Sequence, residues 1–243
     1  MAGHSKFANI KHKKEREDNK RGKLFTKLGR EITVAVKESG KDVEFNPRLR
    51  LAIAKAKAFN MPKENIDRAL KKGAGEGAGG DLEEVKYEGY GPGGVAFVVH
   101  ALTDNRNRTA SEVRHAFNKF GGSLGESGAV SWIFDRCGLI ILEKDGIDEE
   151  EIVDFVLENG AKDFEMAEDI YIFCEMDKLY SLEKKCSNKY KVKEIVANYF
   201  IPKNFIKLDK ESYEKVLKMA EHIENLDDVQ DLYYNSEEDV EDN

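Results

Sequence analysis

A glycine-rich segment divides the chain and sets the first limit on its fold. Residues 73–80 have the sequence Gly-Ala-Gly-Glu-Gly-Ala-Gly-Gly. Five glycines in eight residues leave no side chains that could build a core, so the segment is expected to act as a flexible connector. We therefore expect a domain boundary here, with residues 1–75 folding as a small domain and the larger part of the chain starting at residue 81.

Charge is distributed unequally on the two sides of this connector. Residues 1–72 carry 20 Lys and Arg against 9 Asp and Glu, a net charge of +11. The remaining residues carry 19 against 38, a net charge of −19, so the −8 of the whole chain hides a strong asymmetry. Like charges within each part repel one another, which suggests that the basic part has an anionic partner and the acidic part does not.

Helix signals recur three times before the connector. Residues 24–36 place apolar side chains on one face of a basic helix. Asn46-Pro47 supplies a cap and a first turn for a second helix, and Pro62 opens a third. Together with the charged stretch that precedes them, these segments predict a basic three-helix bundle with an N-terminal arm over residues 1–75.

Strand and helix signals alternate after the connector. Two strands are predicted around the turn Gly89–Gly94, which lacks the Lys-Ser/Thr that a phosphate-binding loop would need and is therefore interpreted as a hairpin turn. A helix is expected to begin at Thr109. A strand is expected over Val130–Phe134, with Trp132 in the core.

The second half of the chain predicts a further α+β unit. Residues 136–202 contain enough strands and helices for a domain, while the unit before them lacks one helix and one strand. We therefore expect residues 136–202 to be inserted into a discontinuous α+β domain made of residues 81–135 and 203–235. Residues 236–243 are rich in carboxylates and are expected to form a disordered acidic tail.

The strongest functional signal is the density of basic side chains in the N-terminal part. Lys and Arg at such density suit phosphate neutralisation, and a solvated charged helix is the alternative. A second signal lies at Thr103–Thr109, where arginines precede a helix N-terminus that favours anions. Pairing with Asp104 and a turn shaped by Asn105 are the alternative there. The candidate nucleic-acid-binding residues are Lys6, Lys11, His12, Lys13, Lys14, Arg16, Lys20, Arg21, Lys23, Lys27, Arg30, Arg48, Arg50, Arg106, Arg108 and Arg114.

Other chemistry is not indicated by the sequence. Cys137, Cys174 and Cys186 are widely spaced and predict reduced core thiols, and no His or Cys pair has metal-ligand spacing. No metal, cofactor or catalytic residue is expected, although an enzyme assembled from distant residues in a cleft stays an alternative. Neither a signal-peptide core nor an apolar run of the ~18 residues that span a bilayer is found, so we expect no membrane contact and a cytoplasmic location.

Several blocks of the sequence resemble the YebC/PmpR family over the whole chain, most densely over residues 1–135. They are 1–12 (MAGHSKFANIKH), 22–28 (GKLFTKL), 46–53 (NPRLRLAI), 60–66 (NMPKENI), 87–94 (YEGYGPGG) and 102–109 (LTDNRNRT). The chain departs from the pattern at Phe7, where the family usually has Trp and therefore an indole N–H.

The resemblance implies an α+β multidomain fold. It consists of an N-terminal three-helix bundle and two ferredoxin-like α+β domains, with the third domain inserted in the second. It also implies a regulator of gene expression that binds DNA, acting with the transcription machinery. The alternative that the resemblance carries is a ribosome-associated translation factor, or translational activator, that binds ribosomal RNA. The oligomeric state is left open.

Overall fold

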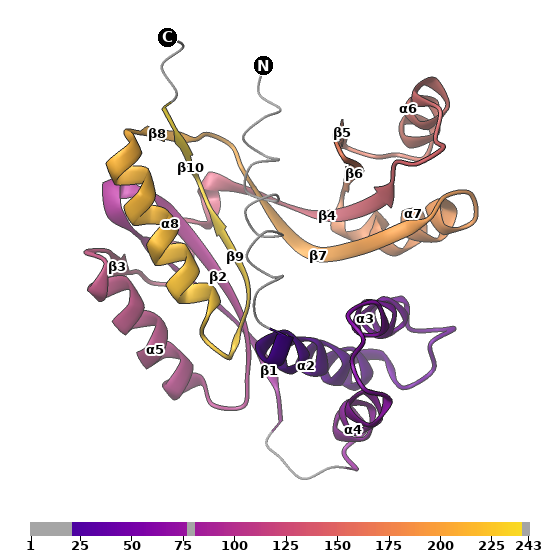
Figure 1. Cartoon of the computed structure of the whole chain (residues 1–243), viewed down its shortest axis with the longest axis horizontal. Helices are drawn as coiled ribbons and strands as arrows, with labels where there is room; N and C mark the ends of the chain where they lie inside the picture. Colours follow the sequence, from indigo (N-terminus) through magenta and orange to yellow (C-terminus); the bar gives the residue numbers. More distant parts are fainter. Residues whose placement is uncertain (1–20, 77–80, 240–243) are drawn as a thin grey trace. The chain divides into compact units, whose positions relative to one another are not determined.

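The structure is a computed structural model that describes residues 21–76 and 81–239, with helices and mainly antiparallel sheets (Figure 1). The helices before the connector are α2 (Arg21–Ser39), α3 (Pro47–Ala58) and α4 (Lys63–Gly73). Their apolar faces meet in one cluster that includes Ile32, Leu49 and Ile66. The hydrophobic spacing predicted these three helices correctly.

Asn46 fixes the connection between α2 and α3. Its side-chain oxygen accepts a hydrogen bond from the backbone N–H of Leu49 at 3.0 Å, which caps α3. Its amide nitrogen donates to the carbonyl oxygens of Ala35 and Gly40 at 2.7 and 2.8 Å. One buried side chain thus satisfies backbone groups at the end of one helix and the start of the next.

A four-stranded sheet follows the connector, in the order β3-β1-β2-β9. Its strands are β1 (Glu83–Tyr90), β2 (Ala96–Thr103), β3 (Ser123–Leu124) and β9 (Val229–Tyr234). Two helices, α5 (Arg106–Lys119) and α8 (Lys210–Glu224), lie on the same face of this sheet (Figure 1). The hairpin predicted at Gly89–Gly94 is confirmed, because β1 and β2 pair antiparallel from Glu83 opposite Thr103 to Tyr90 opposite Ala96.

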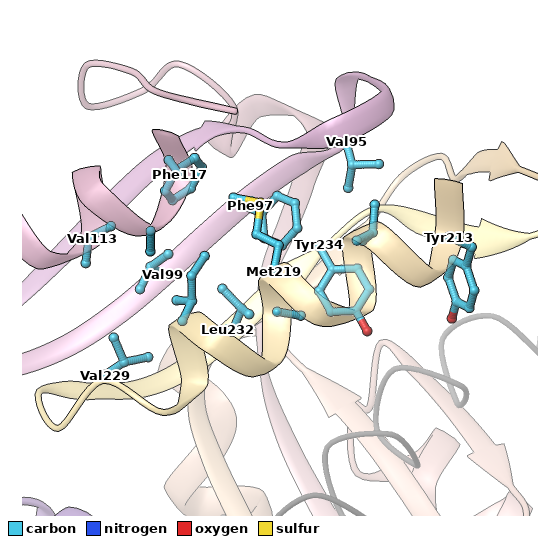
Figure 2. Packing of buried hydrophobic residues seen from close by; sticks show 14 of the residues in the cluster. Val95, Phe97, Val99, Val113, Phe117, Tyr213, Met219, Val229, Leu232 and Tyr234 are labelled. Carbon is cyan, nitrogen blue, oxygen red and sulfur yellow. The ribbon is translucent and has the colours of Figure 1, made fainter. Parts of the chain in front are cut away.

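Phe97 of β2 lies at the centre of the core between sheet and helices (Figure 2). Its ring meets Phe117 of α5 edge to face with centroids 5.9 Å apart and stacks on Tyr234 of β9 at 5.5 Å. Gly89 of β1 allows β3 and α5 to lie close to β1, since a Cβ there would lie 2.4 Å from the carbonyl oxygen of Ser123 and 2.6 Å from the Phe117 ring. The core therefore ties the strand order to the positions of both helices.

Residues 135–201 form a second compact unit. Its elements are β4 (Phe134–Glu143), α6 (Glu149–Glu158), β5 (Asp163–Met166), β6 (Asp169–Cys174), α7 (Leu179–Ser187) and β7 (Val192–Pro202), with the sheet order β5-β6-β4-β7. Alternate residues of β4 and β6, including Ile140 and Ile172, pack against α6 and α7. The three cysteines are free and buried, which confirms their prediction as core thiols.

Three local expectations were wrong: the strand around Trp132, the extent of the acidic tail, and the start of α5, which begins at Arg106 with Asn105 as its cap and not at Thr109. Residues Ser131–Ile133 form a short 3-10 helix, and Trp132 is exposed instead of lying in the core. Residues Ser236–Glu238, expected to lie in a disordered acidic tail over 236–243, instead form β10, which pairs in parallel with β8 (Ile206–Leu208). Residues 240–243 lie outside the described residues.

The first error arose because Val130, Ile133 and Phe134 are buried on either side of the tryptophan, which gave the segment the apolar composition of a strand. The second arose because backbone pairing with β8 holds Ser236–Glu238 regardless of their charge. Within residues 21–76 and 81–239, no helix is both long and apolar enough to cross a membrane.

Asn235 provides a test of the junction between β9 and β10. Its side-chain oxygen accepts from the buried N–H of Ala96 at 2.7 Å. We expect Asn235→Ala to lower the free energy of unfolding by about 1–3 kcal/mol, because the N–H of Ala96 would lose its partner without reaching water. Urea unfolding measures this. Asn118→Ala, at an exposed position of α5, is the control and should be nearly neutral.

Candidate nucleic-acid interface

The sequence-predicted basic residues fall into three groups in the structure. Seven of them (Lys6, Lys11, His12, Lys13, Lys14, Arg16 and Lys20) lie outside the described residues. Arg21 begins α2, and the structure does not describe its side chain. The other eight lie on α2, α3 and α5, where their surroundings decide which of them can contact an external phosphate.

One face of α2 docks on the end of α8. The ammonium of Lys23 donates to the carbonyl oxygen of Asn225 at 2.5 Å, and that of Lys27 donates to the carbonyl oxygen of Glu224 at 3.1 Å. These carbonyl groups belong to the C-terminal turn of α8, which carries partial negative charge and lacks intrahelical partners. Lys23 and Lys27 therefore satisfy an internal helix end.

Arg30, on the next turn of α2, reaches a buried carboxylate. Its guanidinium lies 2.6 Å from Oδ1 of Asp228, and it donates to the carbonyl oxygens of Asp227 and Leu102 at 2.5 and 3.2 Å. The side chain of Asp228 is 2% exposed. Arg30 is thus a structural link between α2 and the loop that leads into β9.

The other carboxylate oxygen of Asp228 accepts from three donors, one at the end of β2 and two in the first turn of α5. Its Oδ2 accepts from the hydroxyls of Thr103 and Thr109 at 3.0 and 2.5 Å and from the guanidinium of Arg108 at 2.7 Å. Burial acts to raise the pKa of this carboxyl, but the hydrogen bonds and the charge of Arg30 outweigh it, so the pKa lies below its usual value. Asp228 is therefore held as a carboxylate.

Arg108 is held by ion pairs within the chain, as the alternative to phosphate contact predicted. It pairs with Asp104 at 3.0 Å as well as with Asp228. Asn105 caps α5 by accepting from the backbone N–H of Arg108 at 3.1 Å, so that N–H already has a partner inside the chain. Arg106 is 63% exposed, with Glu83 3.7 Å from its Nε, and Arg114 is exposed on the helix.

Arg48 of α3 is also committed to internal pairs. Its guanidinium donates to Glu31 at 2.7 Å, to Glu38 at 2.8 Å and to Glu84 at 2.8 Å. Burial acts to lower the pKa of Arg48, but Glu31 and Glu84 raise it well above its usual value. Arg50, two residues further along and therefore on a different side of α3, is half-buried and donates to the carbonyl oxygen of Val43 at 3.4 Å.

Sequence reasoning missed the exposed cations of α3 and α4. Lys57, Lys63, Arg68 and Lys71 all have exposed side chains. Arg68 and Lys71 are three residues apart and therefore lie on the same side of α4. The signal was available in the sequence, because both positions lie outside the apolar stripe of Ile66 and Ala69.

A second ionic link, around His100, ties Arg48 to the sheet. Glu84 of β1 accepts from Arg48 and lies 3.9 Å from Nε2 of His100 on β2, while Asp231 of β9 lies 3.5 Å from Nδ1. Burial disfavours the charged imidazole, but Asp231 and Glu84 together raise the pKa of His100 to about 9. Three strands and the helical part are thus joined by alternating charges.

No group of three or more His, Cys, Asp or Glu side chains in the described part of the chain is arranged to hold a metal ion.

Comparisons with known proteins match both parts of the chain. A family model described as the TACO1/YebC protein N-terminal domain matches residues 5–76, and one described as the TACO1/YebC second and third domain matches residues 82–236. A protein of Caldanaerobacter subterraneus subsp. tengcongensis named "Probable transcriptional regulatory protein" is 50% identical over 240 residues, which cover 98% of each chain.

A second relative and a solved structure agree with this match. A protein of Thermotoga maritima with the same name is 52% identical over 242 residues, covering 98% of this chain and 95% of its own. The crystal structure of a conserved hypothetical protein from Aquifex aeolicus is similar with a TM-score of 0.83 and 46% sequence identity, covering 93% of both chains.

Asp228 can be tested by neutralising it without changing its size. We expect Asp228→Asn to lower the free energy of unfolding by about 3–5 kcal/mol, because Arg30 and Arg108 would lose the carboxylate that compensates their partly buried charges. Urea unfolding of the full chain measures the change. The neighbouring Asp227→Asn is a matched control and should cost less than about 1 kcal/mol, since the Asp227 side chain is 71% exposed. Equal effects of the two substitutions would contradict a structural role for the buried pair.

The raised pKa of His100 predicts a pH dependence of stability. The charged imidazole stabilises the fold fully below its unfolded pKa of about 6.5, and this contribution is lost as pH rises towards 9. Between pH 6.5 and 8.5 we expect a loss of about 2 kcal/mol in the free energy of unfolding that His100→Gln does not show. The difference between the two proteins at each pH isolates the histidine. Parallel curves would exclude the proposed ionic link.

Proposed function

This chain belongs to the TACO1/YebC family, and on that premise we propose that it is a regulator of transcription that binds nucleic acid through its N-terminal domain and carries out no catalysis. The names of its relatives support the regulatory role. One observation carries the binding role: exposed cations remain on α3 and α4 after the internal ion pairs of the N-terminal part have been formed.

The internal pairs divide the basic residues into two sets. Lys23, Lys27, Arg30 and Arg48 hold the fold together, and their donors already contact carbonyl or carboxylate oxygens. Lys57, Lys63, Arg68 and Lys71 remain exposed, in a part of the chain with a net charge of +11. Exposed Lys and Arg neutralise phosphates and release counterions, which gives affinity for any nucleic acid. We therefore propose the second set, together with the basic residues of 1–20, as the phosphate-contacting surface.

For the domain arrangement we propose a helical N-terminal domain followed by two ferredoxin-like α+β domains, the third inserted in the second. The order β-α-β-β-α-β over residues 134–202 supports the ferredoxin-like description of the inserted domain. The first sheet, β3-β1-β2-β9, has the same spatial order as the inserted sheet, β5-β6-β4-β7, if its strands are counted β2, β3, β1, β9. The first strand in the chain, β1, then occupies the place of the third strand of the motif.

We further propose that the protein positions itself on phosphates and does not read a long base sequence. The exposed cations are spread over two helices and are mostly lysines, which act as point charges. Reading the major groove usually takes one helix with Arg, Asn or Gln directed at base edges. Discrimination between DNA sequences should therefore be well below the ~10³-fold at the lower end for specific DNA-binding proteins.

The binding role is tested with charge reversals in the full chain. We expect Arg68→Glu with Lys71→Glu to weaken binding to every nucleic acid tested and to reduce the slope of log K against log salt by about 2, roughly 1 for each lost phosphate contact. Fluorescence anisotropy of labelled DNA and ribosomal RNA fragments measures both quantities. Lys184→Glu with Lys185→Glu is the matched control, because it changes the net charge equally at exposed positions of α7.

The control and the test separate local contact from overall charge. If both double variants weaken binding equally, the effect is a general charge effect and the α4 surface is not the interface. If neither the wild type nor any variant binds, the proposed function is wrong. Consistent preference for ribosomal RNA over all DNA would move the proposal from transcription to a role on the ribosome.

A further inference from the structure

Trp132 is the only tryptophan of the chain, and it is 67% exposed. Hydrophobic residues on either side of it are buried: Val130, which precedes the short 3-10 helix, is 0% exposed and Ile133, which ends it, is 8% exposed. Large aromatic side chains dominate core and interface energetics because of the area that they bury. The exposure of this indole, between two buried residues, therefore calls for a functional explanation.

The segment around Trp132 is held firmly in place. The indole N–H donates to the carbonyl oxygen of Ala129 at 3.1 Å, and the hydroxyl of Tyr90 donates to the same oxygen at 3.4 Å. Lys203 makes two further contacts to the segment. Its ammonium donates to the carbonyl oxygen of Trp132 at 2.9 Å, and the backbone N–H of Lys203 donates to the carbonyl oxygen of Ile133. The exposed ring is thus fixed by contacts from β1 and from the chain that follows β7.

A buried carboxylate, that of Glu88, also holds the backbone of this segment. Glu88 of β1 has a fully buried side chain, and its Oε2 accepts from the backbone N–H groups of Val130 and Ser131 at 2.9 and 2.8 Å. Its other oxygen lies 2.8 Å from the ammonium of Lys86. Hydrogen bonds from two consecutive backbone groups to one carboxylate fix the direction in which the next residue, Trp132, leaves the backbone.

The chemistry left at the surface favours a flat aromatic ligand. Because the indole N–H is bonded within the chain, the π-face of the ring is what remains for recognition, beside the positive charge of Lys203 and the ring of Tyr90, which is 37% exposed. Bases that are not paired stack on such rings, and the ammonium of Lys203, which donates to the carbonyl oxygen of Trp132, helps to hold this ring in place.

A protein partner is less well matched by this surface. Protein interfaces have an apolar core formed by several residues. Of the large hydrophobic side chains that are exposed in the described residues, Val43, Phe45, Leu157 and Tyr180 come from other segments, and only Tyr90 shares a contact with the Trp132 segment. The exposed apolar area here is one indole and part of one phenol ring.

We propose that Trp132, with Tyr90 and Lys203 beside it, is a stacking platform for an unpaired base of single-stranded nucleic acid. This inference rests on the proposed function, because it assigns a second contact to the same class of ligand. It adds that the ligand has at least one unpaired base, which phosphate contacts alone do not require.

The single tryptophan makes the test direct. Unlabelled single-stranded DNA, single-stranded RNA and the corresponding duplexes are added to the full chain while indole emission is recorded, and labelled versions are used in parallel to measure affinity by anisotropy. We expect a single strand to change indole emission in proportion to binding and a duplex to leave it nearly unchanged. The DNA and RNA arms identify which strand the platform takes.

Substitutions supply the second measurement. Trp132→Ala should weaken single-strand binding about tenfold, within the range found when a base-stacking aromatic is removed, and duplex binding less than about twofold. Trp132→Phe should retain most of the affinity and controls for folding, together with the urea midpoint of each variant. Leu157→Ala is the matched control, since Leu157 is 63% exposed and lies on α6.

The outcomes separate this inference from the proposed function. If anisotropy reports binding but indole emission and the affinity of Trp132→Ala do not change, the platform is wrong and the proposed function stands. An equal response to duplex and single strand also overturns the platform. If no nucleic acid binds at all, both proposals fail. Indole emission that responds to a protein partner and to no nucleic acid would assign the tryptophan to a protein interface and overturn the inference.

Discussion

The arrangement of the first unit depends on the carboxylate of Asp228. This side chain lies in the loop between α8 and β9, yet it is bound by Arg30 of α2, by Thr103 at the end of β2 and by Arg108 and Thr109 of α5. A buried charge is tolerated only when it is paired and hydrogen-bonded, so all of these elements must meet at one point for the fold to be stable. The same requirement holds the helical part against the sheet.

This use of charge changes how the basic N-terminal part should be understood. A net charge of +11 suggested a surface devoted to an external polyanion. The structure instead divides the charge between an inner set, which binds carbonyl groups at the end of α8 and the carboxylates of Asp228 and Glu84, and an outer set on α3 and α4. Because the inner set uses the acidic part of the chain as its partner, the opposite charges of the two parts contribute to the fold.

Much of the local structure could be predicted because its causes are local. Asn46 caps α3, the glycines before β2 form the hairpin turn, and the apolar stripes of α2 to α4 meet in one core. The failures also have local explanations. Trp132 lies among apolar neighbours that alone are buried, and Ser236–Glu238 are acidic but obtain backbone partners from β8.

By itself, the sequence determined where most of the helices and the main hairpin form, which end of the chain is basic, and which family the chain belongs to, since caps, periodicity and motifs act over a few residues. Only the tertiary structure decided which cations are available to a ligand. Arg30 meets the backbone of Asp227 from 197 positions away, and no pattern near either residue records that contact. The free energy of a charge depends on the groups that surround it in space, and these become neighbours only when the chain folds.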